Sequence, residues 1–233
     1  MFKPEISLII PAYNEAERIG KSLLSAQNYL KDNFETYEIV VVDDGSTDGT
    51  ANLARNYGHS VKVFQLERNT GKGAAVRKGM LESTGRLRVF SDADFSTPIY
   101  ELKKIIGELE SGADVCIGSR AIQPELIKVH QPFFRELLGK TFNLFVRTIL
   151  FSGIKDTQCG FKGFKDYAAE QVFSKAKIDG FGFDVEILYI AKKENLKIKQ
   201  VPVEWFNDDR TTVSPVKGLK AFFELFEIKR LHK

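Results

Sequence analysis

Cysteine is scarce in this chain, with only Cys116 and Cys159 among its 233 residues. A small secreted fold held together by several disulfides is therefore excluded. The N-terminal segment MFKPEISLIIP lacks the basic start, the longer apolar stretch and the small-residue cleavage site of a secretory signal. We therefore expect a cytoplasmic protein in which both thiols are reduced.

Long apolar runs are also missing. The richest one, TFNLFVRTILF, is interrupted by Arg147 and is much shorter than the roughly 18 residues that a membrane-spanning helix needs. The sequence thus predicts a protein that does not span a bilayer.

Strong charge of one sign is absent as well, since the net charge is only +3. This value, without an interleaved stripe of basic and aromatic residues, argues against a nucleic-acid partner. The charge is nevertheless uneven: residues 1–118 carry a net −3 and residues 119–233 a net +6. The second half is the better candidate for meeting an anionic partner.

Short, β-branched apolar runs alternate with helical patterns in the first half. Because the runs are nearly continuous, they are typical of strands covered on both faces. The pattern predicts a mostly parallel central sheet flanked by helices, in one domain over 1–233 with halves 1–119 and 120–233. The expected strands are 6–11, 37–44, 60–66, 86–92 and 113–119.

The second half has a looser pattern. We expect a loop and an amphipathic helix over 130–151, a short strand within 156–164, a helix near 182–194, a strand over 197–205 and a final helix. The spacing predicts that two sets of apolar side chains each share one helix face. These sets are Phe134, Leu138, Phe142, Phe145 and Ile149 in the first helix, and Leu219, Phe222, Phe223 and Phe226 in the last.

Polar loops follow the first four strands, and ligands of such sheets bind outside the carboxyl ends of the strands. The fourth loop, DADFSTP, carries Asp92 and Asp94 one residue apart at a strand end, which puts their carboxylates close together. Mg²⁺ or Mn²⁺ suits two such carboxylates, with substrate phosphates and water completing the shell. The alternative is a pair of solvated loop aspartates or a helix cap ahead of Pro98.

Two further loops carry candidate ligand-binding groups. In DDGSTDG, Asp43 or Asp44 could accept a hydrogen bond from a nucleobase N–H, although a strand-to-helix turn with an N-cap explains the same residues. In NTGKG, Gly71 permits close backbone approach and Lys72 offers an ammonium group, both suited to phosphate. This motif lacks the full Walker spacing.

Taken in order, PAYNE, VVVDDGSTDGT, NTGKGAAVRKG and SDADFSTP resemble the family 2 inverting glycosyltransferases, which have a nucleotide-diphospho-sugar transferase fold of the glycosyltransferase-A type. The later motifs DTQCGFKGF, FGFDVEIL and VPVEWFNDDRTTVSP are similar to the branch of dolichyl-phosphate mannose and glucose synthases and their bacterial polyprenyl-phosphate relatives. The resemblance covers nearly the whole chain.

The resemblance implies a role for each matching residue. Asp43 or Asp44 would read the base of the donor, Asp92 and Asp94 would hold the metal against its diphosphate, and Asp156 occupies the position of a proposed catalytic base. The remaining implied donor contacts are Pro11, Ala12, Tyr13, Glu15, Gly71, Lys72 and Ala93, and the implied contacts to the lipid phosphate are Arg120, Arg135, Arg210 and Ser214.

Several of these roles have simpler alternatives. A lipid monophosphate with a second pKa near 6 is already largely a dianion at neutral pH, so Asp156 could orient the sugar or an arginine instead of accepting a proton. Arg120, Arg135 and Arg210 could each be ordinary surface residues, and Asp208 and Asp209 stand beside Arg210. Their joint presence in the basic half favours a phosphate cradle.

We therefore expect a metal-dependent inverting hexosyltransferase that uses Mg²⁺ or Mn²⁺ and moves glucose from UDP-glucose onto a polyprenyl or dolichyl phosphate. Glucose is favoured over mannose because Phe95 to Thr97 follow the DAD motif where some mannosyl enzymes have a glutamine. The alternatives are GDP-mannose as donor, a soluble hydroxyl acceptor, and a non-catalytic nucleotide-sugar-binding subunit.

The expected place of action is the cytoplasmic face of a membrane, with the protein bound peripherally. The FFRELLGKTFNLFVRTILF segment is apolar enough to lie in the membrane interface, although most such stripes simply belong to the core. A membrane-protein partner or a homo-oligomer would also cover this surface.

Overall fold

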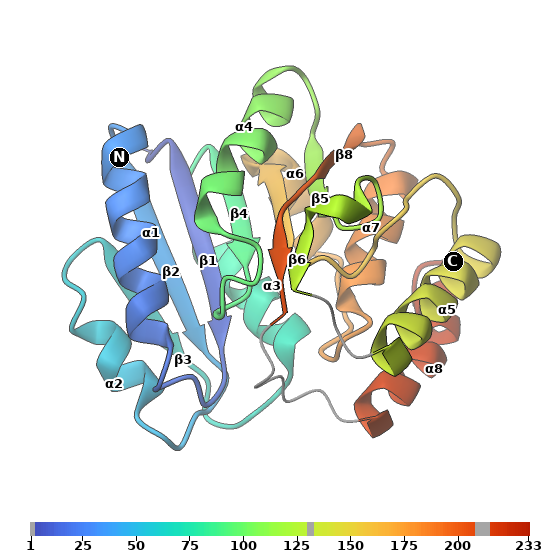
Figure 1. Cartoon of the computed structure of the whole chain (residues 1–233), viewed down its shortest axis with the longest axis horizontal. Helices are drawn as coiled ribbons and strands as arrows, with labels where there is room; N and C mark the ends of the chain where they lie inside the picture. Colours follow the sequence, from blue (N-terminus) through green and yellow to red (C-terminus); the bar gives the residue numbers. More distant parts are fainter. Residues whose placement is uncertain (1–2, 130–132, 208–214) are drawn as a thin grey trace.

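A seven-stranded sheet forms the centre of the computed structural model, which describes residues 3–129, 133–207 and 215–233 (Figure 1). The strand order is β3-β2-β1-β4-β7-β5-β8, and only β7 runs antiparallel to its neighbours. The prediction of a mostly parallel central sheet is confirmed. The strands are β1 (Ile6–Ala12), β2 (Tyr37–Asp43), β3 (Val61–Gln65), β4 (Leu87–Ser91), β5 (Val115–Ser119), β7 (Phe161–Lys165) and β8 (Ile198–Pro202).

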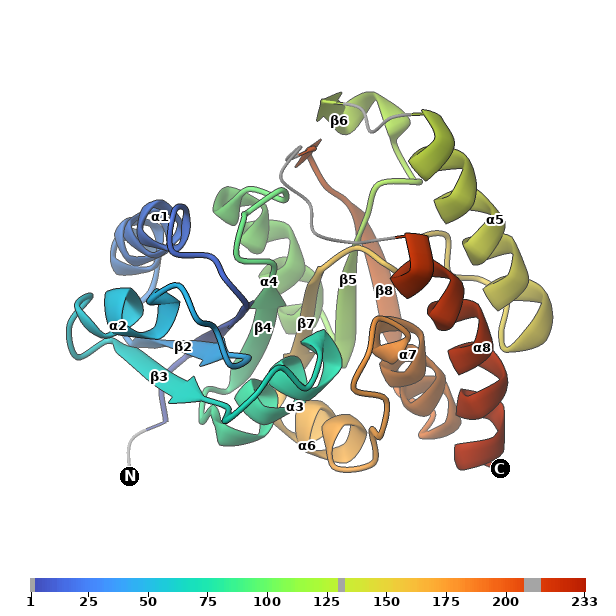
Figure 2. The same ribbon diagram turned by 90° about the horizontal axis from the view of Figure 1, so that it is seen from below.

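Helices cover both faces of this sheet (Figure 2). One face packs against α1 (Ile19–Asn33), α2 (Thr50–Arg55) and α4 (Leu102–Glu110). The other face packs against α3 (Lys72–Glu82), α6 (Asp166–Phe173) and α7 (Phe183–Lys193), with α5 (Phe133–Ile149) and α8 (Pro215–Leu231) beyond them. A small second sheet pairs β6 (Ile127–Val129) with β9 (Trp205–Phe206).

The central strands are mostly apolar because both of their faces are buried. In β1, Ile6, Leu8 and Ile10 pack with α1 and α4, whereas Ile9 points to the opposite core. A methyl group added at Gly79 of α3 would lie only 2.5 Å from Ile9 Cγ2. The glycine therefore lets α3 approach β1 closely, which places the start of α3 at the carboxyl ends of the strands.

The expected short strand within 156–164 is β7, and it lies between β4 and β5 rather than at an edge. It carries a lysine into the core: the Lys162 side chain is fully buried, and its Nζ donates to the Cys159 carbonyl at 2.6 Å and to the Asp184 carboxylate. The sequence pattern did not reveal this central position, because a single short strand carries no signal for its neighbours.

The predicted apolar face of the last helix is only partly correct: Phe222 packs against the core, and the side chain of Leu219 lies outside the described residues. In α8, Leu225 and Ile228 are fully buried, whereas Phe223 and Phe226 are 69% and 62% exposed. The helix packs through Phe222, whose ring meets Phe142 of α5 at a centroid distance of 5.0 Å. Apolar residues occur nearly all around α8, so spacing alone allows two faces, and packing against α5 and α7 selects the other one.

The predicted face of α5 is only partly present. Phe142 is buried as expected, Phe145 is 44% exposed, and the adjacent Val146 is fully buried. Asn143, beside Phe142, accepts hydrogen bonds from the Thr157 backbone and hydroxyl. Within the described ranges, none of the helices has the length and apolar character needed to cross a bilayer.

The observed face of α8 predicts unequal effects for two neighbouring substitutions. Leu225→Ala should lower the free energy of unfolding by about 2–5 kcal/mol, because it leaves a cavity in the core. Phe226→Ala should change it by less than about 0.5 kcal/mol, since the ring lies in solvent. Urea unfolding of both variants measures the difference, and equal losses would contradict the assigned face.

Candidate functional site

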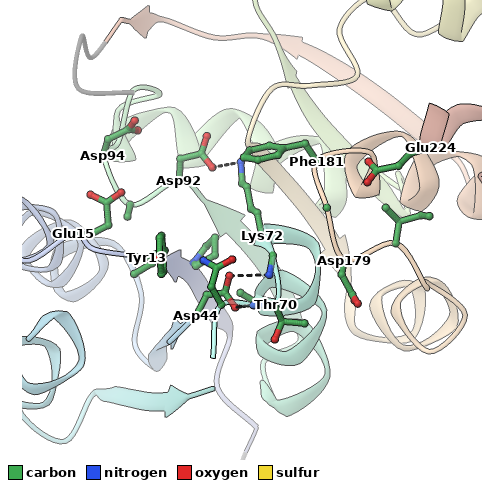
Figure 3. A pocket seen from close by; sticks show the side chains of 18 of the residues that line it. Tyr13, Glu15, Asp44, Thr70, Lys72, Asp92, Asp94, Asp179, Phe181 and Glu224 are labelled. Atoms are coloured by element: carbon green, nitrogen blue, oxygen red, sulfur yellow. Dashed lines mark hydrogen bonds and ion pairs between the residues drawn. The ribbon is translucent and has the colours of Figure 1, made fainter. Parts of the chain in front are cut away.

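A pocket of about 580 Å³ opens where the parallel strands end (Figure 3). Its walls come from the loops after β1, β3 and β4, from Asp44 after β2, from residues 177–181 and from α8. This volume lies in the range of small-molecule ligand sites. The residues that line it are Pro11, Ala12, Tyr13, Glu15, Arg18, Asp44, Asn69, Thr70, Gly71, Lys72, Ala75, Asp92, Ala93, Asp94, Lys177, Ile178, Asp179, Gly180, Phe181, Glu224 and Glu227.

The first two loops are tied to each other by backbone-to-side-chain hydrogen bonds. The Asn14 N–H donates to Ser46 Oγ at 2.8 Å, and the Thr47 N–H donates to the Asn14 side-chain oxygen at 3.0 Å. The Glu15 N–H in turn donates to Thr50 Oγ1 at 2.8 Å. These bonds fix the wall that presents Tyr13 before any ligand binds.

The two adjacent aspartates at the end of β2, Asp43 and Asp44, differ in their surroundings. Asp44 lines the pocket, and its two oxygens accept the Thr70 and Gly71 N–H groups, each at 2.8 Å. Burial raises the pKa of Asp44, although these two donors oppose the shift. Asp43 lies behind the wall, fully buried, with one unpartnered oxygen. Of the two, Asp44 is the one that reaches the pocket.

Lys72 begins α3 and points across the pocket floor. Its Nζ lies 2.5 Å from Asp92 Oδ1 and 5.8 Å from the centroid of the Phe183 ring. Burial alone would lower the pKa of Lys72, but the charges of Asp92 and Asp184 outweigh burial and raise it. The preceding Gly71 has φ = 126°, a conformation that other residues rarely adopt. This glycine allows the loop to turn into the helix at the pocket wall.

Asp92 and Asp94 follow β4 and lie on the same side of the pocket (Figure 3). The Asp92 carboxylate packs against Gly160, where a methyl group would collide with it. Asp94 accepts the Ser96 N–H at 2.9 Å. Burial raises the pKa of Asp94, and the negative charge of Asp92 raises it further.

The two carboxylates fit a hard divalent cation. Burial and the charge of Asp92 both raise the pKa of Asp94, and a cation bound between the two carboxylates would favour their ionised forms. In the part of the chain that the structure describes, no cluster of three or more His, Cys, Asp or Glu side chains could hold a metal ion. Two protein carboxylates match an ion that completes its shell with substrate phosphate and water.

A second polar cluster lies at the end of β5, outside the pocket lining. Asp156 is 2% exposed and accepts four hydrogen bonds: from the Arg120 backbone, Nε and Nη2 at 3.0, 2.8 and 3.0 Å, and from the Gln158 N–H at 3.2 Å. Burial alone would raise the pKa of Asp156, but Arg120 lowers it to about 2. The Arg120 guanidinium also lies over the Trp205 ring at 5.5 Å.

Comparison with known proteins matches residues 7–173 to the profile of glycosyl transferase family 2. The chain belongs to glycosyl transferase family 2. The resemblance inferred from the loop motifs is therefore confirmed.

Curated relatives of this family 2 chain carry one activity in their names. The chain is 37% identical over 226 residues to the dolichyl-phosphate beta-glucosyltransferase of Dictyostelium discoideum, and the match covers 90% of this chain and 69% of the relative. It is 34% identical over 227 residues to the enzyme of the same name from Homo sapiens, covering 91% and 70%.

Solved structures share the fold of this family 2 chain. Glucosyl-3-phosphoglycerate synthase from Mycobacterium tuberculosis, in complex with UDP, superposes with a TM-score of 0.71 at 18% identity, covering 97% of this chain and 80% of that one. Another structure of that synthase contains Mn²⁺, UDP and phosphoglyceric acid, with a TM-score of 0.71 at 19% identity over 98% and 79% of the two chains. The likeness confirms the expected glycosyltransferase-A-like fold.

The structure of this family 2 chain brings most of the expected donor contacts into one pocket and leaves other expected residues outside it. Asp43, Arg120 and Asp156 do not line the pocket. The side chain of Arg135 and the whole of Arg210 and Ser214 lie outside the described residues. The expected residues that line the pocket are Pro11, Ala12, Tyr13, Glu15, Asp44, Gly71, Lys72, Asp92, Ala93 and Asp94.

Sequence reasoning missed the wall formed by residues 177–181 and by Glu224. The segment KIDGFGF carries a signal that could have revealed it, because two glycines flank a phenylalanine immediately before a helix. Glu224 had no such signal, since it stands between two phenylalanine-rich turns of α8 and reads as a solvated position.

The Arg120–Asp156 pair predicts a pH-dependent effect of Asp156→Asn. Because the pKa of Asp156 falls from 3.8 to about 2 on folding, its ionised form stabilises the fold by about 2 kcal/mol above pH 4. That contribution is lost as the pH falls from about 4 to about 2. Urea unfolding of wild type and variant should therefore differ most at neutral pH and converge near pH 2. A difference that is independent of pH would contradict the pairing.

Proposed function

We propose that this family 2 transferase moves glucose from UDP-glucose onto a dolichyl or other polyprenyl phosphate, with inversion at C1. The observation that carries the proposal is its 34–38% identity to dolichyl-phosphate beta-glucosyltransferases over most of the chain. The pocket supports it, because it combines a fixed wall after β1 and β2 with an ammonium and two carboxylates after β3 and β4.

The nucleotide would lie along Pro11, Ala12 and Tyr13, with Asp44 at the base. Asp44 already accepts two backbone donors, but each carboxylate oxygen has a second lone pair for a base N–H. Asp43 instead accepts the Ser46 N–H at 3.2 Å within the turn. We therefore assign base contact to Asp44 and a structural role to Asp43.

The diphosphate would lie between Lys72 and the Asp92–Asp94 pair. Negative charge develops on this leaving group as the C1–O bond breaks, and a positive group held beside it lowers the barrier. Lys72 supplies a positive charge, because its acidic neighbours raise its pKa and keep the amine protonated. A Mg²⁺ or Mn²⁺ ion held by Asp92 and Asp94 would further neutralise the negative charge of the leaving diphosphate.

The acceptor phosphate needs no strong base. A phosphate monoester is largely ionised at neutral pH, so its oxygen can attack C1 directly from the side opposite the leaving group. Asp156, with a pKa of about 2 and four bound donors, is poorly suited to accept a proton. We propose that it positions Arg120, whose N–H groups that do not bind Asp156 can reach a phosphate.

Lipid substrates favour a peripheral position on a membrane surface, which we propose to be the cytoplasmic face. Exposed apolar side chains of α5 and α8 could enter the interface, namely Leu144, Phe145, Phe223 and Phe226. Exposed Lys229 and Arg230 follow on α8 and suit anionic headgroups.

The donor and the acceptor can be tested together. The purified chain with Mg²⁺, UDP-glucose and a short-chain polyprenyl phosphate should yield a β-linked glucosyl phospholipid, detected by mass spectrometry and by the anomeric NMR coupling. Mannose transfer from GDP-mannose should be at least about 10-fold slower than glucose transfer from UDP-glucose, the difference expected from one poorly matched contact. Transfer from GDP-mannose alone, or preferential transfer to a soluble sugar hydroxyl, would contradict the proposal.

The acidic pair predicts a matched loss of metal binding and turnover. Asp94→Asn should lower the transfer rate by about 100-fold or more, since charge stabilisation at the leaving group is lost. It should also abolish the Mn²⁺-dependent part of UDP binding measured by calorimetry. Glu110→Gln, at an exposed pair with Arg86, should change neither. Full activity of the Asp94→Asn variant, or of chelator-treated protein, would exclude the assigned role.

A further inference from the structure

The segment Lys177 to Gly182, here the 177–182 loop, joins α6 to α7 and forms one wall of the pocket. Glu186 of α7 holds its start, because the Lys177 and Ile178 N–H groups donate to that carboxylate, each at 2.9 Å. The N-terminus of α3 holds its middle, since the Gly73 N–H donates to the Asp179 carbonyl at 2.8 Å.

Glu224 of α8 holds the end of this loop. Its side chain points from α8 into the pocket (Figure 3) and is 5% exposed. The Gly182 N–H donates to Glu224 Oε2 at 2.7 Å. A methyl group added at Gly182 would lie 2.6 Å from the same oxygen, and one added at Gly180 would collide with Oε1. The two glycines thus leave the space that the Glu224 carboxylate fills.

The held end of the loop leads directly to groups that surround Lys72. Gly182 precedes Phe183, whose ring lies 5.8 Å from Lys72 Nζ, and Asp184, whose charge helps to raise the pKa of Lys72. The loop also packs on the first turn of α3, because a methyl group added at Gly73 would collide with the Ile178 carbonyl. A shift of the loop would therefore move the surroundings of Lys72.

We infer that Glu224 is a positioning residue. It holds the 177–182 loop in place, and the loop in turn keeps Lys72 in a position to contact the donor diphosphate. Its carboxylate contacts the loop at Gly180 and Gly182, so its effect would pass through Gly182 and the start of α7. The inference rests on the proposed function, since it assumes that a nucleoside diphosphate binds next to Lys72. The role requires only a side-chain oxygen at position 224 that accepts the hydrogen bond of the Gly182 N–H, and glutamine can also supply such an oxygen.

Calorimetric titration of the full chain with UDP and Mg²⁺ tests this role. Glu224→Ala should weaken UDP binding by about 10-fold, the effect of losing one buried hydrogen bond to a charged group. Glu224→Gln should stay within about 2-fold of wild type. As a control, Glu194→Ala removes a carboxylate from the far end of α7, where it pairs with Lys175 at 2.7 Å, and should leave UDP binding unchanged.

Gly180→Ala gives an independent route to the same change. The added methyl group would push the Glu224 carboxylate away from Gly182, so this variant should lose as much UDP affinity as Glu224→Ala. The double variant should lose no more than either one alone, because both act on the same hydrogen bond.

A double-mutant cycle of Glu224→Ala with Lys72→Gln separates a positioning role from mere stabilisation of the fold. If Glu224 acts through Lys72, Lys72→Gln should weaken UDP binding strongly in the wild-type background and by less than about 2-fold in the Glu224→Ala background. A purely structural role would lower the melting temperature and leave the two effects additive.

Three outcomes would overturn the inference alone while wild type binds UDP: unchanged affinity of Glu224→Ala, tighter binding by both Glu224 variants, or additive effects with Lys72→Gln. The second would indicate that the carboxylate merely repels the diphosphate. A wild-type chain that binds no UDP would overturn the proposed function, and the inference with it.

Discussion

Opposite charges alternate from the open pocket into the core of this protein, and the site depends on this alternation. Asp92 meets Lys72 at 2.5 Å, Lys72 lies in the field of Asp184, and Asp184 binds the fully buried Lys162. A buried charge is tolerated only when it is paired and hydrogen-bonded. Each member of this series therefore holds the next one in place, from the buried Lys162 out to the Asp92 carboxylate beside the pocket.

The unusual strand of the sheet supplies the innermost charge. Because β7 runs antiparallel between β4 and β5, Lys162 lies directly opposite Phe90 in the register, one strand away from the Asp92 turn. Its ammonium lies 5.4 Å from the Phe90 ring and also binds the Cys159 carbonyl. A parallel strand at an edge of the sheet could not bring a cation beneath the pocket in this way. The break in the parallel pattern thus supports, from the core, the charges that line the pocket.

The sequence predicted the loops at the strand ends well and the second half less well. Asp92, Asp94 and Lys72 follow apolar strands, and the topology of parallel sheets brings such ends together. By contrast, the burial of Leu225 rather than Phe226 depends on which helix α8 meets, and its periodicity carries no such information. The sequence allowed Asp156 to orient an arginine but did not indicate which one, since 36 positions separate it from Arg120 and only the fold joins β5 to the segment before β7.

Helix α8 links two surfaces that the sequence presents as one apolar stretch. Glu224 points into the pocket, whereas its neighbour Phe223 and the nearby Phe226 face solvent. On a helix, successive residues point about 100° apart, so adjacent positions serve opposite environments. If the exposed phenylalanines enter a lipid interface, the same rigid element that touches the membrane also holds the wall beside Lys72. A lipid-borne acceptor and a water-borne donor would then meet at a site whose two sides share one helix, which fits transfer at a membrane surface better than transfer in free solution.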